Sequence, residues 1–185
     1  MKRPVRVVVI DSGVQAAHPH INGASGGIGV NSDGDLHDDY VDRLGHGTAV
    51  TAVIREKALL AEMFVAKVFD RELAASGVAL VAAVSRMRRG GAGVVAAGAP
   101  DGVPWLPGTL PGAWRVTIVW SLPRDQCRVV VDGREFSFLA SGFPRPIPGV
   151  PAEKNLKGLS FAVANVSGLL AALFDRFDMP GSACI

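Results

Sequence analysis

The stretch Val5-Arg6-Val7-Val8-Val9-Ile10-Asp11-Ser12-Gly13 decides the fold. Its first six residues are mostly apolar and β-branched, a pattern typical of a strand buried on both faces of a parallel sheet. Asp11 follows this run directly, so a carboxylate stands where the strand ends. In open α/β sheets, ligands bind beyond the carboxyl ends of the strands. Asp11 is therefore the first candidate for a functional residue.

Strand and helix patterns alternate after this strand. Gly45-His46-Gly47-Thr48 opens a helix that continues through residues 49–58, and a second helix at residues 78–89 stops at Gly90-Gly91. Further strands are predicted at residues 62–69 and 93–97. This alternation favours parallel βαβ units. We predict a three-layer α/β/α architecture with a mainly parallel sheet, and one domain over residues 1–185.

The remaining segments fit around this body. Residues 22–42 are rich in Gly, Asp and Asn, which predicts a long surface loop. Strands are expected at residues 114–120, 127–131 and 135–139, with a turn at Asp132-Gly133. After a Pro-rich loop at 143–151, residues 160–174 form a helix that is apolar nearly all round. Such a helix is predicted to lie at the centre of the fold.

Composition narrows the class of protein. Hydrophobic residues make up 49% of the 185 and charged residues 19%, which indicates a globular chain. The mean hydropathy of +0.29 fits a compact core, or an apolar surface that meets a partner. Net charge is only +2, and the basic run at residues 86–89 complements a helix dipole. We expect no nucleic-acid partner.

The termini and cysteines indicate a compartment. The chain begins four residues before the first strand, so we expect neither a signal peptide nor a pro-segment. Apolar stretches are broken by Gly or charge before ~18 residues, so no membrane span is expected. Cys127 and Cys184 are far apart in sequence and are predicted to be free thiols. These features favour a cytoplasmic location.

Three residues offer the parts of a nucleophilic site. A serine hydroxyl reacts only when a neighbouring base takes its proton, and a buried carboxylate holds that base in the right tautomer. Asp11 ends a strand, whereas His46 and Ser160 each begin a predicted helix. All three are therefore expected in one crevice. Taken singly, a turn-forming Asp and a helix-capping Ser are the plainer interpretations.

Three segments, in this order, resemble the signature motifs of the subtilisin family (subtilases, peptidase S8). Residues 9–13 (VIDSG) resemble the family's strand ending in Asp-Ser/Thr-Gly, with Val14 and His18-Pro19 following as in the family. Residues 46–48 match its His-Gly-Thr motif. Residues 158–162 (GLSFA), followed by 166–173 (VSGLLAAL), resemble the head of its central helix. The acid-base-nucleophile order also matches.

The resemblance implies a function and roles. Ser160 would be the nucleophile, His46 the general base and Asp11 the group that orients it, in hydrolysis of a peptide bond through an acyl-enzyme. It also implies that Asp42 lies near the substrate cleft, although a solvated loop acid explains that residue nearly as well. No cofactor is implied. An acid-rich loop could hold calcium, but a solvated loop is favoured, and we predict no metal (Asp33, Asp35, Asp38, Asp39 and Asp42).

The chain also departs from the family pattern. Leu159 replaces the usual Thr, and Ala164-Asn165 replaces Pro-His. The stretch between His46 and Ser160 is shorter than the family uses. One segment therefore serves either as the strand that lines the substrate or as the strand that delivers the oxyanion Asn (Gly93, Val94, Val95, Ala96, Ala97 and Gly98). Under the second alignment Ala99 stands where the amide should be, and both alignments lose that amide.

Three functions follow as hypotheses. The leading one is an intracellular serine endopeptidase that processes selected peptides, such as a genetically encoded peptide precursor. The alternative is a weak or inactive peptide-binding subunit that a partner chain completes, either a second copy or another protein. An esterase would need a Gly-x-Ser-x-Gly elbow, which Ser160 lacks. Loss of one oxyanion donor lowers the rate by ~10²–10³-fold, so the triad would still act, slowly.

Overall fold

One mixed sheet organises the protein. The computed structural model describes residues 3–99, 103–133, 135–177 and, as backbone only, 182–184. The described strands lie in the order β3-β2-β4-β1-β9-β5-β6-β8-β7. Only β2–β3 and β7–β8 pair antiparallel. Their bounds are β1 Arg6–Asp11, β2 Gly26–Val30, β3 Leu36–His37, β4 Glu62–Lys67, β5 Gly93–Ala97, β6 Ala113–Ile118, β7 Cys127–Asp132, β8 Glu135–Ala140 and β9 Ser182–Cys184.

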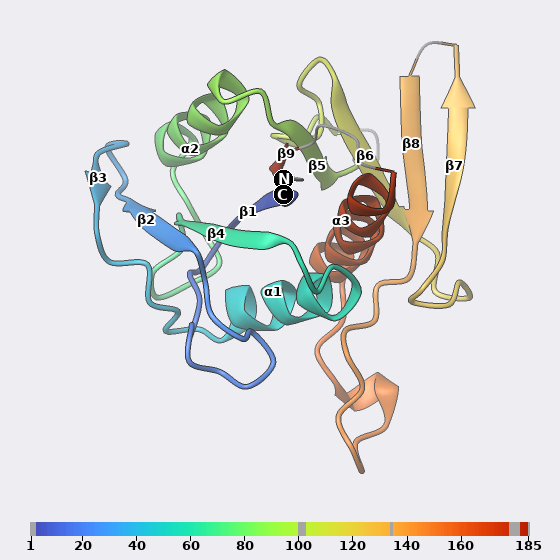
Figure 1. The fold of residues 1–185 in the computed structure, drawn as a ribbon. Helices are drawn as coiled ribbons and strands as arrows, with labels where there is room; N and C mark the ends of the chain where they lie inside the picture. Colours follow the sequence, from blue (N-terminus) through green and yellow to red (C-terminus); the bar gives the residue numbers. More distant parts are fainter. Residues whose placement is uncertain (1–2, 100–102, 134, 178–181, 185) are drawn as a thin grey trace.

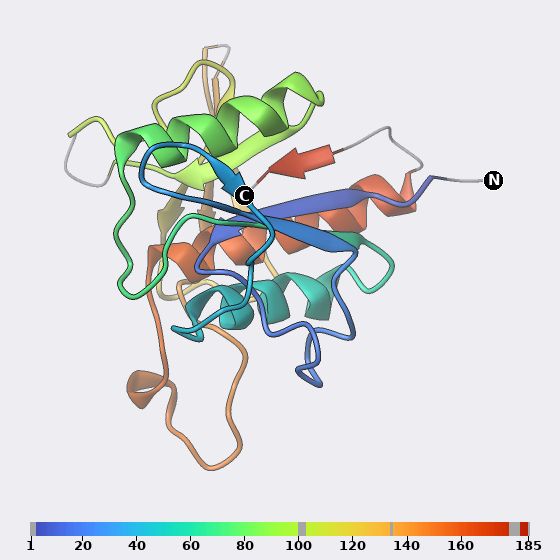
Figure 2. The same cartoon turned by 90° about the vertical axis from the view of Figure 1, so that its left-hand side faces the viewer.

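Helices cover both faces of the sheet. Helices α1 (His46–Lys57) and α3 (Leu159–Arg176) pack against each other on one face, and α2 (Gly77–Arg89) covers the other. Figure 2 shows the three layers edge-on, with α2 above the sheet and α1 and α3 below it. The predicted three-layer α/β/α architecture is confirmed. A short 3-10 helix, Ala152–Lys154, interrupts the Pro-rich loop.

Strand β1 explains why this sheet forms. Val7 and Val9 are 0% and 1% exposed and pack with Val53 of α1 and Phe161 of α3. The alternate residue Ile10 points to the opposite face and packs with residues of α2. Burying one such side chain stabilises the fold by about 1.5–3 kcal/mol. The apolar run therefore anchors both helical layers and fixes where the strand's last residue, Asp11, emerges.

The prediction of a surface loop at residues 22–42 is wrong in part. Strands β2 and β3 form there, and β2 pairs parallel with β4. The glycines that suggested a loop are needed for packing, because a β-carbon at Gly27 would overlap the ring of Tyr40. A close approach of this kind is one of the reasons for glycine within a strand.

Strand β9 was not anticipated from the sequence. It pairs parallel with the first half of β1, from Arg6 to Val8, and with Gly93 and Val94 of β5. The prediction that β1 and β5 belong to one parallel sheet holds, but a strand from the far end of the chain separates them. Beyond Cys184 the described structure has no strand between the carboxyl halves of β1 and β5.

Helix α3 is the central helix that its composition predicted. It also has the length and mean hydropathy (1.3) of a membrane span, so the expectation that no apolar stretch reaches that length does not hold for residues 159–176. However, 56% of the helix is buried, and it packs against α1, β5, β6 and β8. A central position in the core accounts for its apolar composition.

Candidate active site

Asp11 lies at the carboxyl end of β1, as its sequence position predicted. Its side chain is 8% exposed, and the backbone N–H of Ser12 donates a hydrogen bond of 2.7 Å to Oδ1. Both carboxylate oxygens face the ring of His46, at 2.8 Å and 3.0 Å from Nδ1. The carboxylate is thus held by its own strand and aimed at one partner.

His46 is the first residue of α1, and its ring lies between an acid and a hydroxyl. Nδ1 faces Asp11, and Nε2 lies 3.0 Å from Oγ of Ser160. The ring of Phe161 packs against it with centroids 5.7 Å apart. The hydrogen bond to Asp11 raises the pKa of His46 above its ordinary value, although burial of the ring opposes the charge. Asp11 therefore stabilises the protonated imidazole.

Ser160 lies in the first turn of α3, after Gly158, whose extended backbone starts the helix. Its hydroxyl is part-buried and faces the His46 ring across 114 positions of sequence. Backbone N–H groups in the first turn of a helix have no acceptor within it, and they favour nearby negative charge. The structure therefore brings the three predicted residues into one hydrogen-bonded chain beside a helix N-terminus.

Two glycines allow this close approach. A β-carbon at Gly47, next to His46, would overlap the backbone carbonyl oxygen of Gly13. Gly13 itself has φ +106°, and a β-carbon there would lie 2.5 Å from the carbonyl oxygen of Tyr40. A side chain at Gly47 would push α1 away from the end of β1, and one at Gly13 would push away the loop backbone at residues 40–42. Gly47 therefore allows His46 to approach Asp11, and Gly13 allows the loop before α1 to approach the end of β1.

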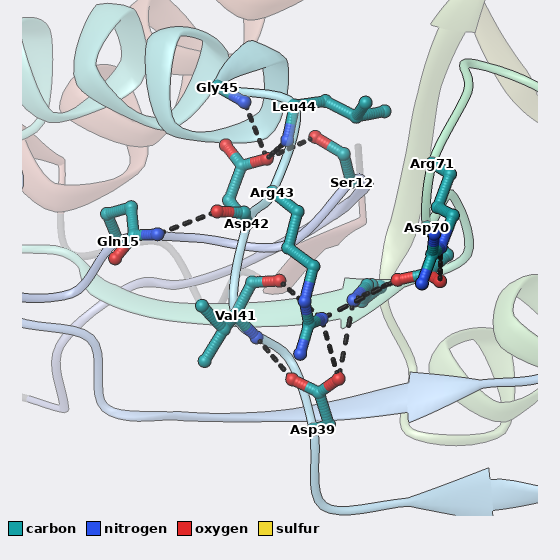
Figure 3. Close-up of polar contacts among 11 residues, drawn as sticks. Ser12, Gln15, Asp39, Val41, Asp42, Arg43, Leu44, Gly45, Asp70 and Arg71 are labelled. Carbon is teal, nitrogen blue, oxygen red and sulfur yellow. Dashed lines mark hydrogen bonds and ion pairs between the residues drawn. The ribbon is translucent and has the colours of Figure 1, made fainter.

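Asp42, which was expected near the substrate cleft, is an interior residue in the loop before α1. It is 2% exposed. Figure 3 shows its carboxylate among Ser12, Leu44 and Gly45, all of which donate hydrogen bonds to Oδ1. The N–H and hydroxyl of Thr48 donate to Oδ2. Burial opposes its ionisation, but these hydrogen bonds outweigh that effect and hold its pKa below the ordinary value.

The sequence analysis missed Ser12 as a residue that supports the site. Its hydroxyl donates to Asp42 and accepts a hydrogen bond from the Gly47 N–H, next to His46. Ser12 therefore connects the end of β1, the loop before α1 and the first turn of α1. The only signal in the sequence was its place between Asp11 and Gly13, which does not specify a partner 30 residues away.

Among the other acids of the loop, Asp39 pairs with cations. Asp39 accepts a hydrogen bond of 2.7 Å from Arg43, which lowers the pKa of Asp39 to about 2. Figure 3 shows Arg43 between Asp39 and Asp70. The buried Lys67 ammonium lies 2.8 Å from Asp70. Within the described residues, no three His, Cys, Asp or Glu side chains form a group that could hold a metal ion.

The two asparagines near Ser160 serve the adjacent loop. Nδ2 of Asn165, which is fully buried, donates to the carbonyls of Ser141 and Phe143. Nδ2 of Asn155 donates to the carbonyl of Arg145. Both amides are therefore committed to backbone carbonyls. Ala99, the residue at the predicted oxyanion position, is half-buried and has no amide side chain.

A cavity of about 190 Å³ adjoins the triad. Asp11 and Ser160 are its polar lining, and the rest of the wall is apolar, from β1, β5, all three helices and the loop residues Phe69, Leu106 and Pro107. Of the predicted segment 93–98, Val94, Val95, Ala96 and Ala97 line this cavity. Gly93 pairs with β9 and packs on Trp114, and the Gly98 N–H bonds to the Val116 carbonyl, so neither lines it.

No family model matches the sequence, and no curated protein matches it either. Solved structures do match the fold. The prenylagaramide maturation protease PagA superposes with a TM-score of 0.59 and 19% identity, over 96% of this chain and 78% of that chain. A cold-adapted subtilisin-like serine proteinase gives 0.59 and 15%, over 94% and 76%. The chain has a subtilisin-like fold.

The sheet position next to β1, on the side of β5, is only partly filled by a described strand. β9 fills only the half of that position remote from Asp11, because its pairing with β1 ends at Val8. The half nearest Asp11 adjoins the cavity, which Val9, Ile10 and Asp11 line from one side and Val95 to Ala97 from the other. Among the described residues no strand occupies this half, and the cavity there extends to Ser160.

Proposed function

We propose that this chain is a subtilisin-like serine endopeptidase that uses Asp11, His46 and Ser160. The observation that carries the proposal is the continuous contact Asp11–His46–Ser160, with 2.8 Å on one side of the imidazole and 3.0 Å on the other. A carboxylate, an imidazole and a hydroxyl in this relation are the parts that acyl transfer needs. The likeness to two proteases gives the same parts a fitting fold.

The proposed reaction has two halves. Nε2 of His46 takes the hydroxyl proton as Oγ of Ser160 attacks the peptide carbonyl. The same proton then passes to the leaving amine, the C–N bond breaks, and an acyl-enzyme remains. Water repeats the sequence, giving its proton to His46 and releasing the new carboxyl group with Ser160 restored. Asp11 orients the imidazole and stabilises the imidazolium in both halves.

We infer that stabilisation of the oxyanion is the weak part of this machinery. The amides of Asn155 and Asn165 already donate to loop carbonyls, and Ala99 has none to offer. The backbone N–H of Ser160, in the first turn of α3, is the donor we assign to the oxyanion. With a side-chain donor missing, the enzyme is expected to be slower by ~10²–10³-fold.

The position of β5 supports one of the two alignments that the sequence left open. In a doubly wound sheet the first strand on the far side of β1 lies beside β1, and the next strand of the chain lies one place further out. β9 lies beside β1, and β5 lies beyond β9. We therefore assign β5 to the oxyanion strand, with Ala99 following it, and assign the open half-position between β1 and β5 to the substrate.

The cavity supports a class of substrate. Its wall is formed mostly by aliphatic and small side chains, among them Val50, Leu80 and Val163. A peptide with an apolar side chain at the residue that supplies the scissile carbonyl would bury that side chain here. The small apolar cavity and the weak oxyanion site favour selective processing over general digestion. The structural neighbour PagA is named as a maturation protease, which is a processing enzyme of this kind.

The compartment of the enzyme and the redox state of its thiols also belong to the proposal. We propose a cytoplasmic protease that needs no metal, nucleic acid or membrane, and whose thiols stay reduced. Cys127 is a free cysteine, and burial raises the pKa of its thiol, which lowers its reactivity.

The second candidate function is a peptide-binding subunit that does not cut. Ala99 at the oxyanion position is the observation that favours it. In that case a partner chain would occupy the open half-position beside β1 and complete the sheet. The intact Asp11–His46–Ser160 contact argues for the protease, because binding alone does not need it.

The experiment that separates the two functions measures cleavage and binding together. The wild type, Ser160→Ala and Ser85→Ala, a control on α2, are incubated with a mixed peptide library, and new termini are read by mass spectrometry. The protease account predicts cuts after apolar residues with the wild type and Ser85→Ala and none with Ser160→Ala. Retention of peptides without new termini would favour the binding subunit.

A further inference from the structure

The outer edge of strand β7 is an apolar surface at the end of the sheet. β7 is the last strand in the sheet order, and Figure 1 shows it at the rim of the molecule. Val129, Val130 and Val131 are 55%, 41% and 61% exposed, and Phe136 of β8 is 49% exposed. An edge strand presents unpaired backbone groups to which another chain can add a strand.

Few of the devices that protect such an edge occur in the middle of β7. Proteins blunt exposed edges with charged residues, above all Lys, with Pro or with β-bulges. The charges of β7 stand only at Arg128 and Asp132, on either side of three valines. β7 contains no Lys or Pro, and it pairs with β8 residue for residue from Cys127↔Ala140 to Asp132↔Glu135, without a bulge. The three central residues are β-branched valines, which favour strand pairing. The outer edge of β7 can therefore pair with a further strand.

The sequence of the edge identifies what covers it. Residues 128–132 read Arg-Val-Val-Val-Asp, so the segment is complementary to itself when two copies run antiparallel. We propose that β7 pairs with β7 of a second copy of this chain, about a two-fold axis at Val130. Arg128 then lies opposite Asp132 of the second copy, and Val129 lies opposite Val131. A two-fold axis repeats each contact twice.

The alternation of side chains supports this register. Side chains along a strand alternate between faces, so Arg128, Val130 and Asp132 share one face and Val129 and Val131 the other. In this register Arg128 and Asp132 of the two copies lie opposite each other on one face. Val129 and Val131 lie opposite each other on the other face. Moving the axis to Val129 would place Arg128 opposite Val130 and lose both charge pairs. Opposite charges directly across a strand pair are favourable, and like charges are unfavourable.

The dimer leaves the candidate active site open. Strands β9, β5, β6 and β8 lie between β7 and β1, which carries Asp11. Association and peptide cleavage are therefore separate properties, and failure of either proposal leaves the other standing.

Charge reversal tests the register directly, with oligomeric state measured by analytical ultracentrifugation. Arg128→Asp places Asp opposite Asp twice, and Asp132→Arg places Arg opposite Arg twice. Each variant alone is expected to raise the dimer dissociation constant about 10- to 100-fold relative to the wild type. An equimolar mixture of the two restores opposite charges and is expected to form a heterodimer with affinity near that of the wild type.

Two controls carry the same charge changes on other surfaces. Arg86→Asp on α2 and Asp33→Arg in the loop after β2 are exposed and should dimerise like the wild type. Recovery in the mixture also shows that both edge variants are folded. A wild type that stays monomeric, including one that binds only an unrelated partner at this edge, would overturn the proposal. So would single variants that dimerise normally, or a mixture that fails to associate.

Discussion

The hydroxyl of Ser12 donates a hydrogen bond of 2.9 Å to Oδ1 of Asp42 and accepts another from the N–H of Gly47. Ser12 adjoins Asp11, and Gly47 adjoins His46. The buried Asp42 therefore holds together the two backbone segments from which the acid and the base of the candidate site project. Substitutions at these residues should affect stability and activity together.

Asp42→Asn tests this connection. An amide cannot accept all the hydrogen bonds that Ser12, Leu44, Gly45 and Thr48 donate, so the free energy of unfolding should fall by about 3 kcal/mol at pH 7. Because the pKa of Asp42 is below its ordinary 3.8, its contribution is present above that value and is lost as the pH falls through the lowered pKa. Urea unfolding at several pH values measures the difference between wild type and variant.

The matched control is Asp39→Asn, in the same loop. Asp39 pairs with Arg43 at the surface, where such pairs contribute little. We expect no measurable loss of stability. Equal effects of the two substitutions would contradict the special position of Asp42.

The pH dependence of cleavage should follow His46. The base must be neutral, and its hydrogen bond to Asp11 raises its pKa above 6.5, while burial opposes that shift. The acid limb of kcat/KM should therefore have its midpoint above pH 6.5 and rise toward alkaline pH. Asp11→Asn should move that midpoint to lower pH and reduce kcat about 10⁴-fold. An unchanged midpoint in that variant would exclude Asp11 as the partner of the base.

Ala99→Asn tests the assignment of β5 to the oxyanion strand. A new amide donor at that position should raise kcat by about 10- to 100-fold, approaching the effect known for one oxyanion donor. Ala99→Asp has the same shape but supplies a carboxylate, so it should not raise kcat. If both variants behave like the wild type in single-turnover assays, β5 does not deliver the oxyanion residue.

The cavity should set the preference for the substrate side chain. Leu80 lines it from α2, whereas Ser160 belongs to α3, so Leu80→Trp reduces the space without replacing a triad residue. We expect kcat/KM for peptides with Leu or Phe before the scissile bond to fall about 10- to 200-fold, with Ala peptides less affected. Leu80→Met, of similar volume, is the control. Equal losses for Ala and Leu peptides would place the side-chain pocket elsewhere.

Much of the fold follows from local sequence patterns. The apolar run before Asp11 predicts β1, and the paired glycines at 90–91 correctly mark the end of α2. The β7–β8 hairpin follows from the two strands predicted on either side of the turn at Asp132-Gly133. Here the local preference and the tertiary structure agree, so a single sequence is sufficient.

Other features depend on contacts between distant segments. β2 was missed because its glycines make room for Tyr40, an event that its own composition does not reveal. β9 has only three described residues, and its place is fixed by pairing with β1 and β5. The burial of Asp42 depends likewise on donors from two segments. The three triad residues were predicted by their motif order, but their distances required the structure.

The central claim is that His46 and Asp11 make Ser160 a nucleophile. Labelling with a fluorophosphonate, followed by mapping of the modified residue by mass spectrometry, tests it most directly. The account predicts one label, on Ser160, in the wild type, and labelling lost in Ser160→Ala and His46→Ala. A folded wild type that resists the reagent, or one labelled equally well without His46, would contradict it.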